Sequence, residues 1–209
     1  MHSMLSLDYV VNSIFSSVTY VIPCSKGIEY GRDCWLVDCG DVEKVIEKGW
    51  NVVGVLLTHV HFDHIYGLNR LLEVMPNAVV YTNADGYNAL LDPRLNFSRY
   101  HTDAPDFILD RKEAVRIIQA EEVLELQGGL RVNVFFTPGH TPNCISYGIG
   151  DCLFTGDAYI PGVKVVTTFP RSNKQEAQQS LERLKDLEEQ GLRVKAGHKV
   201  LMKDVWANL

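Results

Sequence analysis

Seven residues from Thr58 to His64 read Thr-His-Val-His-Phe-Asp-His and directly follow an apolar run at residues 52–57. That run has the length and the β-branched content of a strand buried on both faces. His59 and His61 stand two apart, so in an extended chain they project to one side and can bind one cation. Burying three histidines and an aspartate without a metal would carry a large desolvation cost. The segment therefore predicts a metal site at the end of a buried strand.

Further metal-binding side chains occur at comparable places along the chain. Asp63 and His64 follow where the chain is predicted to turn into a helix, which lets them face a second ion. His140 in Thr-Pro-Gly-His-Thr-Pro, Asp157 in Thr-Gly-Asp-Ala and His198 in Ala-Gly-His each come after a predicted strand and a glycine. Such glycines are typical of tight turns. Because strand ends can meet at one edge of a sheet, we expect these side chains to converge on one pocket.

Hydropathy patterns predict alternating strands and helices. Runs of β-branched, aromatic and other apolar residues predict strands at residues 10–22, 34–38, 52–57, 78–82, 130–136, 152–155 and 194–196. Helical spacing predicts helices after Asp41, at residues 65–75, at residues 84–91, and from a Ser172–Gln175 capping box to Gly191. Proline and glycine lie at strand ends, as in a layered domain whose loops carry function.

Composition restricts the function classes. A chain of 209 residues suits one domain, expected to span residues 1–209 without a C-terminal substrate domain. The 46% hydrophobic and 22% charged residues exclude a disordered or coiled-coil chain. A net charge of −6 argues against nucleic-acid binding, and the apolar runs are too short to span a membrane. Five scattered cysteines and the lack of a secretory leader predict a cytoplasmic protein.

The four motifs, in this order, resemble the metallo-β-lactamase superfamily over nearly the whole chain. The resemblance implies an α+β fold, a four-layer αβ/βα sandwich with a binuclear metal cleft at one edge of its two sheets. It also implies two sets of three ligands and one bridging carboxylate: His59, His61 and His140; Asp63, His64 and His198; and Asp157. This donor set suits two zinc ions and also accommodates iron or manganese.

Differences among branches of the superfamily narrow the resemblance. The β-lactamases that use a cysteine ligand lack a histidine equivalent to His64 and carry cysteine in place of Asp157. Residues 91–98 and the Thr-Pro-Gly-His-Thr motif are similar to small glyoxalase-II-like (hydroxyacylglutathione hydrolase-like) metallohydrolases. Glyoxalase II itself adds a helical domain that helps bind glutathione, whereas only residues 199–209 follow the last ligand. The resemblance thus implies the hydrolytic centre without that domain.

The predicted function is hydrolysis of a small acyl substrate of the thioester or lactone type. Two divalent ions that share a water lower its pKa toward about 7, and the metal-bridging hydroxide attacks the acyl carbon. Asp63 and Asp157 are the candidate catalytic residues, which accept hydrogen bonds from the hydroxide and orient it. Tyr159, Arg171 and Lys174 are candidate substrate contacts, the first toward a substrate oxygen and the other two toward a carboxylate.

Two other functions remain open. A persulfide-dioxygenase-like enzyme would use one iron on two histidines and a carboxylate, here His59, His140 and Asp157. A metal-binding protein without turnover would use the same ligands without chemistry. Metal content separates the two enzymes, since about two zinc-class ions per chain favour hydrolysis and one iron with oxygen uptake favours the dioxygenase.

Overall fold

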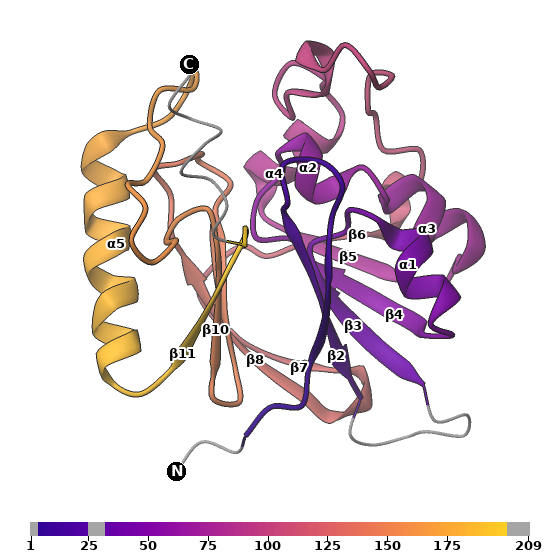
Figure 1. Cartoon of the computed structure of the whole chain (residues 1–209), viewed down its shortest axis with the longest axis horizontal. Coiled ribbons are helices and arrows are strands. Elements are labelled where there is room, and N and C mark those ends of the chain that lie inside the picture. The colour runs from indigo at the N-terminus through magenta and orange to yellow at the C-terminus, as the bar shows by residue number, and fades with distance from the viewer. Residues whose placement is uncertain (1–3, 25–31, 200–209) are drawn as a thin grey trace.

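The computed structural model describes residues 4–24 and 32–199. These residues form two β-sheets that pack face to face, with helices on the outer face of each sheet (Figure 1). The order of layers is helix, sheet, sheet, helix. The α+β four-layer sandwich expected from the sequence is therefore confirmed.

The first sheet combines an antiparallel and a parallel half. Its strands lie in chain order, and they are β1 (Asp8–Val11), β2 (Val18–Pro23), β3 (Asp33–Val37), β4 (Asn51–Leu56), β5 (Val79–Thr82) and β6 (Val115–Ile117). Strands β1, β2 and β3 pair antiparallel, whereas β3 to β6 pair parallel. Parallel pairing brings the carboxyl ends of these strands to one edge, where the histidine motif follows β4.

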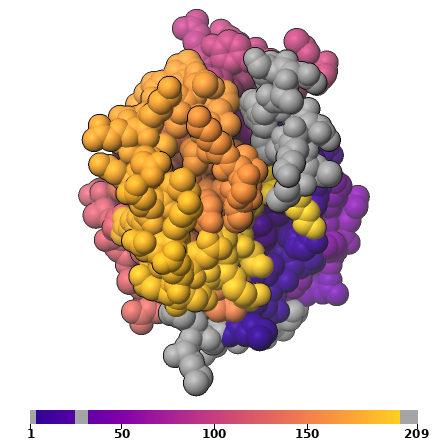
Figure 2. All heavy atoms as spheres, turned by 60° about the vertical axis from the view of Figure 1, so that its left-hand side comes forward, coloured from indigo at the N-terminus to yellow at the C-terminus, as the bar shows by residue number. Residues whose placement is uncertain are grey.

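The second sheet has the order β11-β10-β9-β8-β7. Its strands are β7 (Val123–Leu126), β8 (Leu130–Phe136), β9 (Ile145–Ile149), β10 (Cys152–Gly156) and β11 (Arg193–Ala196). Beyond β11 the chain reaches the first sheet, since Val18 N donates to Gly197 O and Ser17 bridges His198. In Figure 2 the yellow C-terminal residues accordingly lie against the indigo N-terminal ones. This contact brings the last histidine to the edge that carries the first ones.

Helices cover the outer faces of both sheets. The first sheet carries α1 (Val42–Glu47), α2 (Phe62–Ile65), α3 (Leu68–Val74) and α4 (Ala84–Leu90), and the second carries α5 (Lys174–Glu189). Single 3-10 turns occupy Ser98–Tyr100, Lys112–Ala114 and Gln127–Gly129. Among the described helices, none has both the length and the apolar content that a membrane crossing requires.

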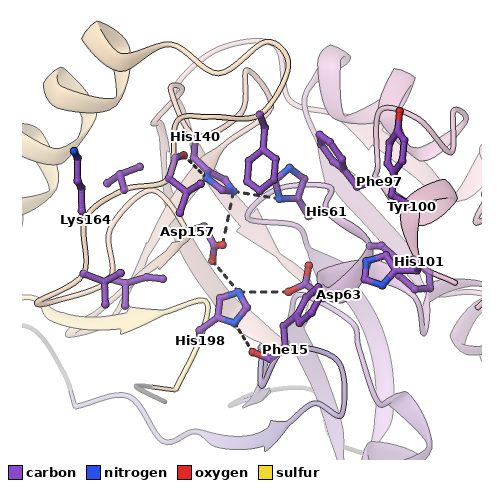
Figure 3. A pocket seen from close by; sticks show the side chains of 16 residues that line it. Phe15, His61, Asp63, Phe97, Tyr100, His101, His140, Asp157, Lys164 and His198 are labelled. Atoms are coloured by element: carbon purple, nitrogen blue, oxygen red, sulfur yellow. Dashed lines mark hydrogen bonds and ion pairs between the residues drawn. The ribbon is translucent and has the colours of Figure 1, made fainter. Parts of the chain in front are cut away.

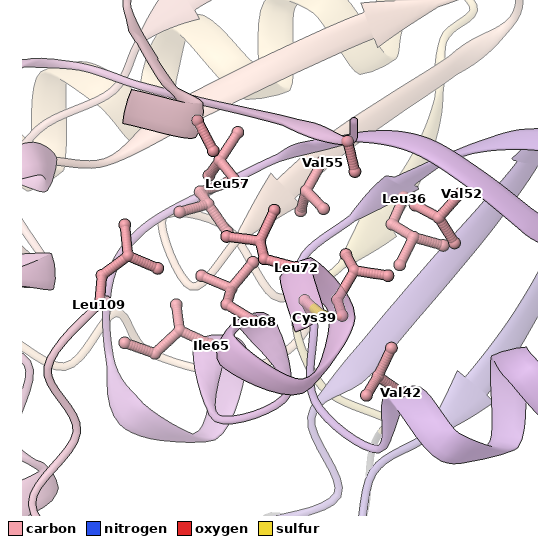
Figure 4. Packing of buried hydrophobic residues seen from close by; sticks show 14 of the residues in the cluster. Leu36, Cys39, Val42, Val52, Val55, Leu57, Ile65, Leu68, Leu72 and Leu109 are labelled. Carbon is pink, nitrogen blue, oxygen red and sulfur yellow. The ribbon is translucent and has the colours of Figure 1, made fainter. Parts of the chain in front are cut away.

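Strand β4 is buried on both faces, as its continuous apolar run predicts. Val55 points into the core between the first sheet and its helices, where it joins Leu68 and Leu72 of α3 (Figure 4). Leu56 points the other way, into the core between the sheets with Tyr147 and other large side chains. Burial on both sides holds the end of β4 in place, and that end positions the first metal motif.

Two predicted elements are divided in the structure. Residues 10–22 form the hairpin of β1 and β2, because the chain turns between them with Phe15 at φ 50° and Ser16 at φ 54°. The helix expected at residues 65–75 is interrupted at Gly67, which separates α2 from α3. A Cβ at Gly67 would lie 2.1 Å from the carbonyl oxygen of Gly40, so only glycine allows the two backbones to approach there.

Two predicted helix caps are also corrected. Asn173, rather than Ser172, caps α5, because its side chain accepts from the backbone N–H groups of Gln175 and Glu176. Asp41 precedes α1 but makes no capping bond; its carboxylate accepts instead from Ser13 N and Oγ. Both caps were inferred from residue type alone, and tertiary contacts redirected the side chains.

Candidate metal centre

All seven predicted ligand side chains meet at one edge of the sandwich, each at the carboxyl end of a strand or in the turn or short helix that follows it. The contributors are His59 and His61 after β4, Asp63 and His64 in α2, His140 after β8, Asp157 after β10 and His198 after β11. Their convergence follows from topology, because the two sheets present these strand ends to the same side of the molecule.

The ligand atoms fall into overlapping groups of three, each with its atoms within 4.8 Å of one another. These groups are His59, His61 and His140; His59, His64 and Asp157; and Asp63, His64 and His198. His61 Nδ1 lies 3.2 Å from His140 Nε2 in the first group, and His64 Nε2 lies 3.2 Å from His198 Nε2 in the third. Such spacing lets several donor atoms reach one ion.

Asp157 lies between the first and third groups (Figure 3). One oxygen, Oδ2, is 3.7 Å from His140 Nε2. The other, Oδ1, is 3.4 Å from His198 Nε2 and 3.6 Å from His64 Nε2. The two oxygens of one carboxylate thus face different halves of the centre, which is the arrangement that a bridging ligand requires.

Three of the ligand imidazoles donate their outer Nδ1–H to an oxygen acceptor outside the centre. The pairs are His64 to Asp38 Oδ2 at 2.9 Å, His140 to Val166 O at 2.8 Å and His198 to Phe15 O at 2.9 Å. Each bond orients the ring and leaves the Nε2 lone pair directed into the centre, as is general for histidine ligands.

Asp38 is a functional residue that the sequence reasoning missed. It is 1% exposed, and its carboxylate also accepts from the backbone N and the Oγ1 of Thr58, both at 2.7 Å. The available sequence clue was a charged residue at the end of an apolar run, Cys-Trp-Leu-Val-Asp. Asp38 ties His64 to the residue that precedes the first histidine of the motif.

Burial and neighbouring charge set opposite pKa shifts within the centre. Burial, together with His64 and His61, holds the pKa of His59 well below its usual value. Burial and His140 likewise lower the pKa of His61 to about 3. These two rings therefore remain neutral at physiological pH, in the form that binds metal ions.

Carboxylates raise the pKa of His64, and imidazoles lower the pKa of Asp157. Burial alone would lower the pKa of His64, but Asp63 and Asp38 outweigh it and raise that pKa well above its usual value. Burial alone would raise the pKa of Asp157, but the surrounding imidazoles, His198 first, hold it well below its usual range. Both effects show that this half of the centre stabilises positive charge strongly, and a divalent ion competes for the same nitrogen as a proton.

The residues fit a metal ion. Nε2 of His59 and Oδ1 of Asp157, two residues of the second group, are buried and have no hydrogen-bond partner. Buried polar atoms are almost always paired, so two adjacent orphaned lone pairs indicate a missing electrophile. Five imidazoles and two carboxylates match the donors that zinc prefers and that iron and manganese also accept.

A cavity of about 400 Å³ opens onto these ligands. Besides five of them, its wall includes Phe15, Phe62, Phe97, Tyr100, His101, Phe169, Ile160 and residues 163–166. No sequence pattern indicated this wall, apart from Phe97 in the segment noted at residues 91–98. An apolar pocket with a few convergent polar groups is the usual form of a small-molecule site.

The three candidate substrate contacts do not line this cavity. The hydroxyl of Tyr159 donates to Glu188 at 2.7 Å, and its ring packs beneath α5. Arg171 forms an ion pair with Asp85 at 2.6 Å, and Lys174 begins α5. Lys164 lines the cavity instead. The three residues were chosen because they follow Asp157 in the sequence. The sequence did not show that the chain after Asp157 directs their side chains away from the cavity.

The family model of the metallo-beta-lactamase superfamily matches residues 28–190. The chain therefore belongs to this superfamily, as its motifs indicated.

Sequence identity to individual members of the superfamily is modest. The chain is 27% identical over 133 residues to a hydroxyacylglutathione hydrolase of Buchnera aphidicola, covering 62% of this chain and 44% of that protein. Overall, the chain spans about half the length of the curated relatives it matches. Among solved structures, TTHA1623 in a di-iron-bound form has a TM-score of 0.75 and 25% identity, covering 92% of both chains. ETHE1 from Myxococcus xanthus has a TM-score of 0.67 and 25% identity, covering 95% of this chain and 77% of that one.

Proposed function

We propose that this protein is a binuclear metal-dependent hydrolase of small acyl substrates of the thioester or lactone type. The observation that carries the proposal is the position of Asp157, whose two oxygens face two separate groups of ligands. Similarity to a hydroxyacylglutathione hydrolase supports an acyl substrate. We propose zinc as the native metal, since the donors are imidazole and carboxylate.

Bound divalent ions would supply a water of lowered pKa and would polarise a carbonyl oxygen. The protein's own residues position the reactants. Asp63 and Asp157 have pKa values below the usual range, although burial opposes the shift, because His64 and His198 lie beside them. Both are therefore ionised at neutral pH and accept hydrogen bonds from the attacking water, which fixes its orientation toward the acyl carbon.

The wall of the cavity supports water as the nucleophile. Among the described residues that line the cavity there is no serine, threonine or cysteine. An acyl-enzyme route through an aliphatic hydroxyl or a thiol consequently has no candidate there. The aromatic side chains around the ligands limit access of bulk water, which strengthens electrostatic interactions within the site.

A mononuclear iron dioxygenase is the second candidate, favoured by the structural similarity to ETHE1. It would use His59, His140 and Asp157 and would leave Asp63 and His198 without a metal. Those two residues lie with His64 in a compact group of their own. This second complete set of candidate ligands supports the hydrolase over the dioxygenase.

The test is a metal analysis combined with a substrate screen. Protein freed of metal is reloaded with zinc, iron or manganese and assayed against thioesters, lactones, β-lactams and phosphodiesters. The hydrolase predicts about two ions per chain, together with thioester or lactone cleavage. One iron with oxygen uptake on a persulfide would instead establish the dioxygenase, and full metal occupancy without turnover would establish a binding protein.

We further propose that the partner is a small molecule rather than a nucleic acid or a membrane, and that the protein acts in the cytoplasm. The size of the cavity, about 400 Å³, and the net charge of −6 support the first proposal. All five cysteines are buried and unpaired, which supports a reducing compartment.

A further inference from the structure

One side of the cavity is a continuous group of aromatic rings beside the metal ligands. The ring of Phe97 lies 4.8 Å from that of His61 and 5.1 Å from that of Phe169. The ring of Phe169 lies 5.5 Å from that of His140, and Tyr100 lies 5.9 Å from Phe97. In Figure 3, Phe97, Tyr100 and His101 are grouped on the side opposite Lys164, with the ligands between them. An acyl carbon placed at the ligands would have this wall beside it.

A second group of rings forms the mouth of the cavity. The ring of His101 packs 4.9 Å from Phe62 and 5.3 Å from Phe15. Phe15 is 46% exposed and Tyr100 is 66% exposed, although both are large apolar side chains. Exposed aromatic residues that cluster around a concave site are typical of a ligand-binding surface.

Two of these aromatic residues adopt a strained backbone conformation. Phe15 has φ 50° and Phe97 has φ 65°, in the left-handed region that bulky residues rarely occupy. Each such residue costs about 1–3 kcal/mol and persists where the surrounding structure enforces it, which is most often at a functional site. Glycine would fit both turns without strain. A phenylalanine at each of these strained positions therefore indicates a role for the ring.

The remaining wall carries little charge. Ile160, Val163, Val165 and Val166 are aliphatic, and Lys164 is the one lysine or arginine among the described residues that line the cavity. Glutathione carries two carboxylates and one ammonium group, and each charge moved out of water needs a partner. One lysine cannot match three charges, whereas the aromatic and aliphatic surfaces match an uncharged apolar group.

We propose that the site selects acyl compounds whose acyl group is aromatic or bulky aliphatic, in preference to glutathione conjugates. This inference rests on the proposed function and specifies its substrate class. In the reaction, water adds to the acyl carbon, the carbon–sulfur bond breaks, the acid is released, and the thiolate takes up a proton. The apolar acyl group contacts Phe97 and Phe169 while the mouth residues Phe15 and Tyr100 close around it.

Binding of the product acid tests this inference without turnover. Acetate and phenylacetate share the carboxylate and differ by the ring, so calorimetric titration of zinc-loaded protein with each measures the contribution of the ring alone. We expect phenylacetate to bind at least about tenfold more tightly, the least that one apolar group is worth in a fitting pocket. Equal affinity for the two acids would overturn the proposal.

Alanine variants of the mouth residues test whether the preference for phenylacetate over acetate arises in this cavity. We expect Phe15→Ala and Tyr100→Ala each to reduce the preference for phenylacetate several-fold. The matched control is Ile117→Ala, which truncates an exposed apolar residue on β6 (45% exposed) that does not line the cavity. Metal content is measured for every variant, so that loss of an ion is not mistaken for loss of the wall. An unchanged preference in both aromatic variants would show that the ring binds elsewhere and would overturn the proposal.

Kinetics separates this inference from the proposed function. Phenylacetyl and acetyl thioesters of one small thiol are compared with a lactoyl thioester of glutathione. We expect kcat/KM to be highest for the phenylacetyl compound. If all three are hydrolysed but the glutathione conjugate is best, the hydrolase stands and the apolar preference fails. If none is hydrolysed while phenylacetate still binds more tightly, the proposed function fails and the apolar site stands.

Discussion

The carboxylate of Asp38 accepts a hydrogen bond of 2.9 Å from Nδ1 of His64, 26 residues later in the chain. The same carboxylate accepts two hydrogen bonds from Thr58. One buried aspartate after β3 therefore fixes both the start of the histidine motif and the ring of its last member. Such outer contacts generally tune metal affinity as well as ligand position.

We expect Asp38→Asn to weaken metal binding. The amide keeps the size of the side chain but removes the charge that raises the pKa of His64, and one of its two ends can no longer accept. Loss of such a contact typically costs 10–100-fold in metal affinity. Competition with a chromogenic chelator measures the change. The control is Asp85→Asn, which removes an exposed carboxylate paired with Arg171; the interpretation fails if both variants bind zinc equally well.

Replacing the bridging candidate tests the centre of the site. We expect Asp157→Ala to lower both metal occupancy and hydrolysis, because it removes a carboxylate that faces both halves. Cys144→Ala is the comparison. Cys144 lies shortly after the motif of His140 in the sequence, but it is a buried free thiol and is not one of the seven candidate ligands. Elemental analysis and initial rates give the two readouts. Full occupancy with normal turnover in the Asp157 variant would refute a bridging role.

Tyr159 should matter for stability rather than for substrate binding. Its hydroxyl donates to Glu188, so Tyr159→Phe removes one hydrogen bond and leaves the packing under α5 intact. The expected loss is about 1 kcal/mol in the free energy of unfolding, a typical net value for one hydrogen bond. Urea denaturation measures this loss, and KM should stay at the wild-type value. A raised KM with unchanged stability would contradict this interpretation and would indicate that Tyr159 contacts the substrate.

Alkaline pH should destabilise the metal-free protein. Burial, with Cys24 nearby, raises the pKa of Cys34 to about 12, and burial with Asp151 raises that of Cys152 to about 11. An unfolded thiol ionises near pH ~8.5, so above that pH the unfolded chain has lost protons that the folded chain keeps. Stability then falls as pH rises. We expect the urea concentration at the unfolding midpoint, measured with a chelator present, to decrease as the pH is raised from about 8 to about 10.

A matched variant assigns part of this effect. Cys152→Ala removes one of the raised thiols, so its urea midpoint should fall less steeply over the same range. A midpoint that is constant or rises with pH in the wild-type protein would contradict the burial of these thiols.

Local patterns predicted most of the elements, because the hydrophobic pattern that stabilises each of them lies within the element itself. The run at residues 52–57 has the length and branching of a doubly buried strand and contains most of β4, and β8 has the predicted bounds. Strand β9 was missed because Ser146 and Gly148 interrupt its apolar pattern, and burial between neighbouring strands overrides that weak propensity. The break at Gly67 was missed because its cause, Gly40, is distant in sequence.

The convergence of the seven candidate ligands was predictable and the pocket was not. Histidine and aspartate after strands are recognisable in sequence because few other roles explain them together. The wall was not recognisable, because Phe15 falls inside the strand predicted at residues 10–22 and Phe169 lies outside every predicted element, and only the fold brings them to the same cavity. The direction of Tyr159 was likewise set by α5, which lies later in the chain.

The central claim is that two ions act together in acyl hydrolysis, and a zinc titration of metal-free protein tests it most directly. Hydrolysis of a phenylacetyl thioester is measured as zinc is added in known equivalents per chain. Because the ligands form two groups joined by Asp157, we predict a rate that continues to rise through the second equivalent and then levels off. A rate that is complete at one equivalent, or no hydrolysis at any zinc level, would contradict the binuclear hydrolase.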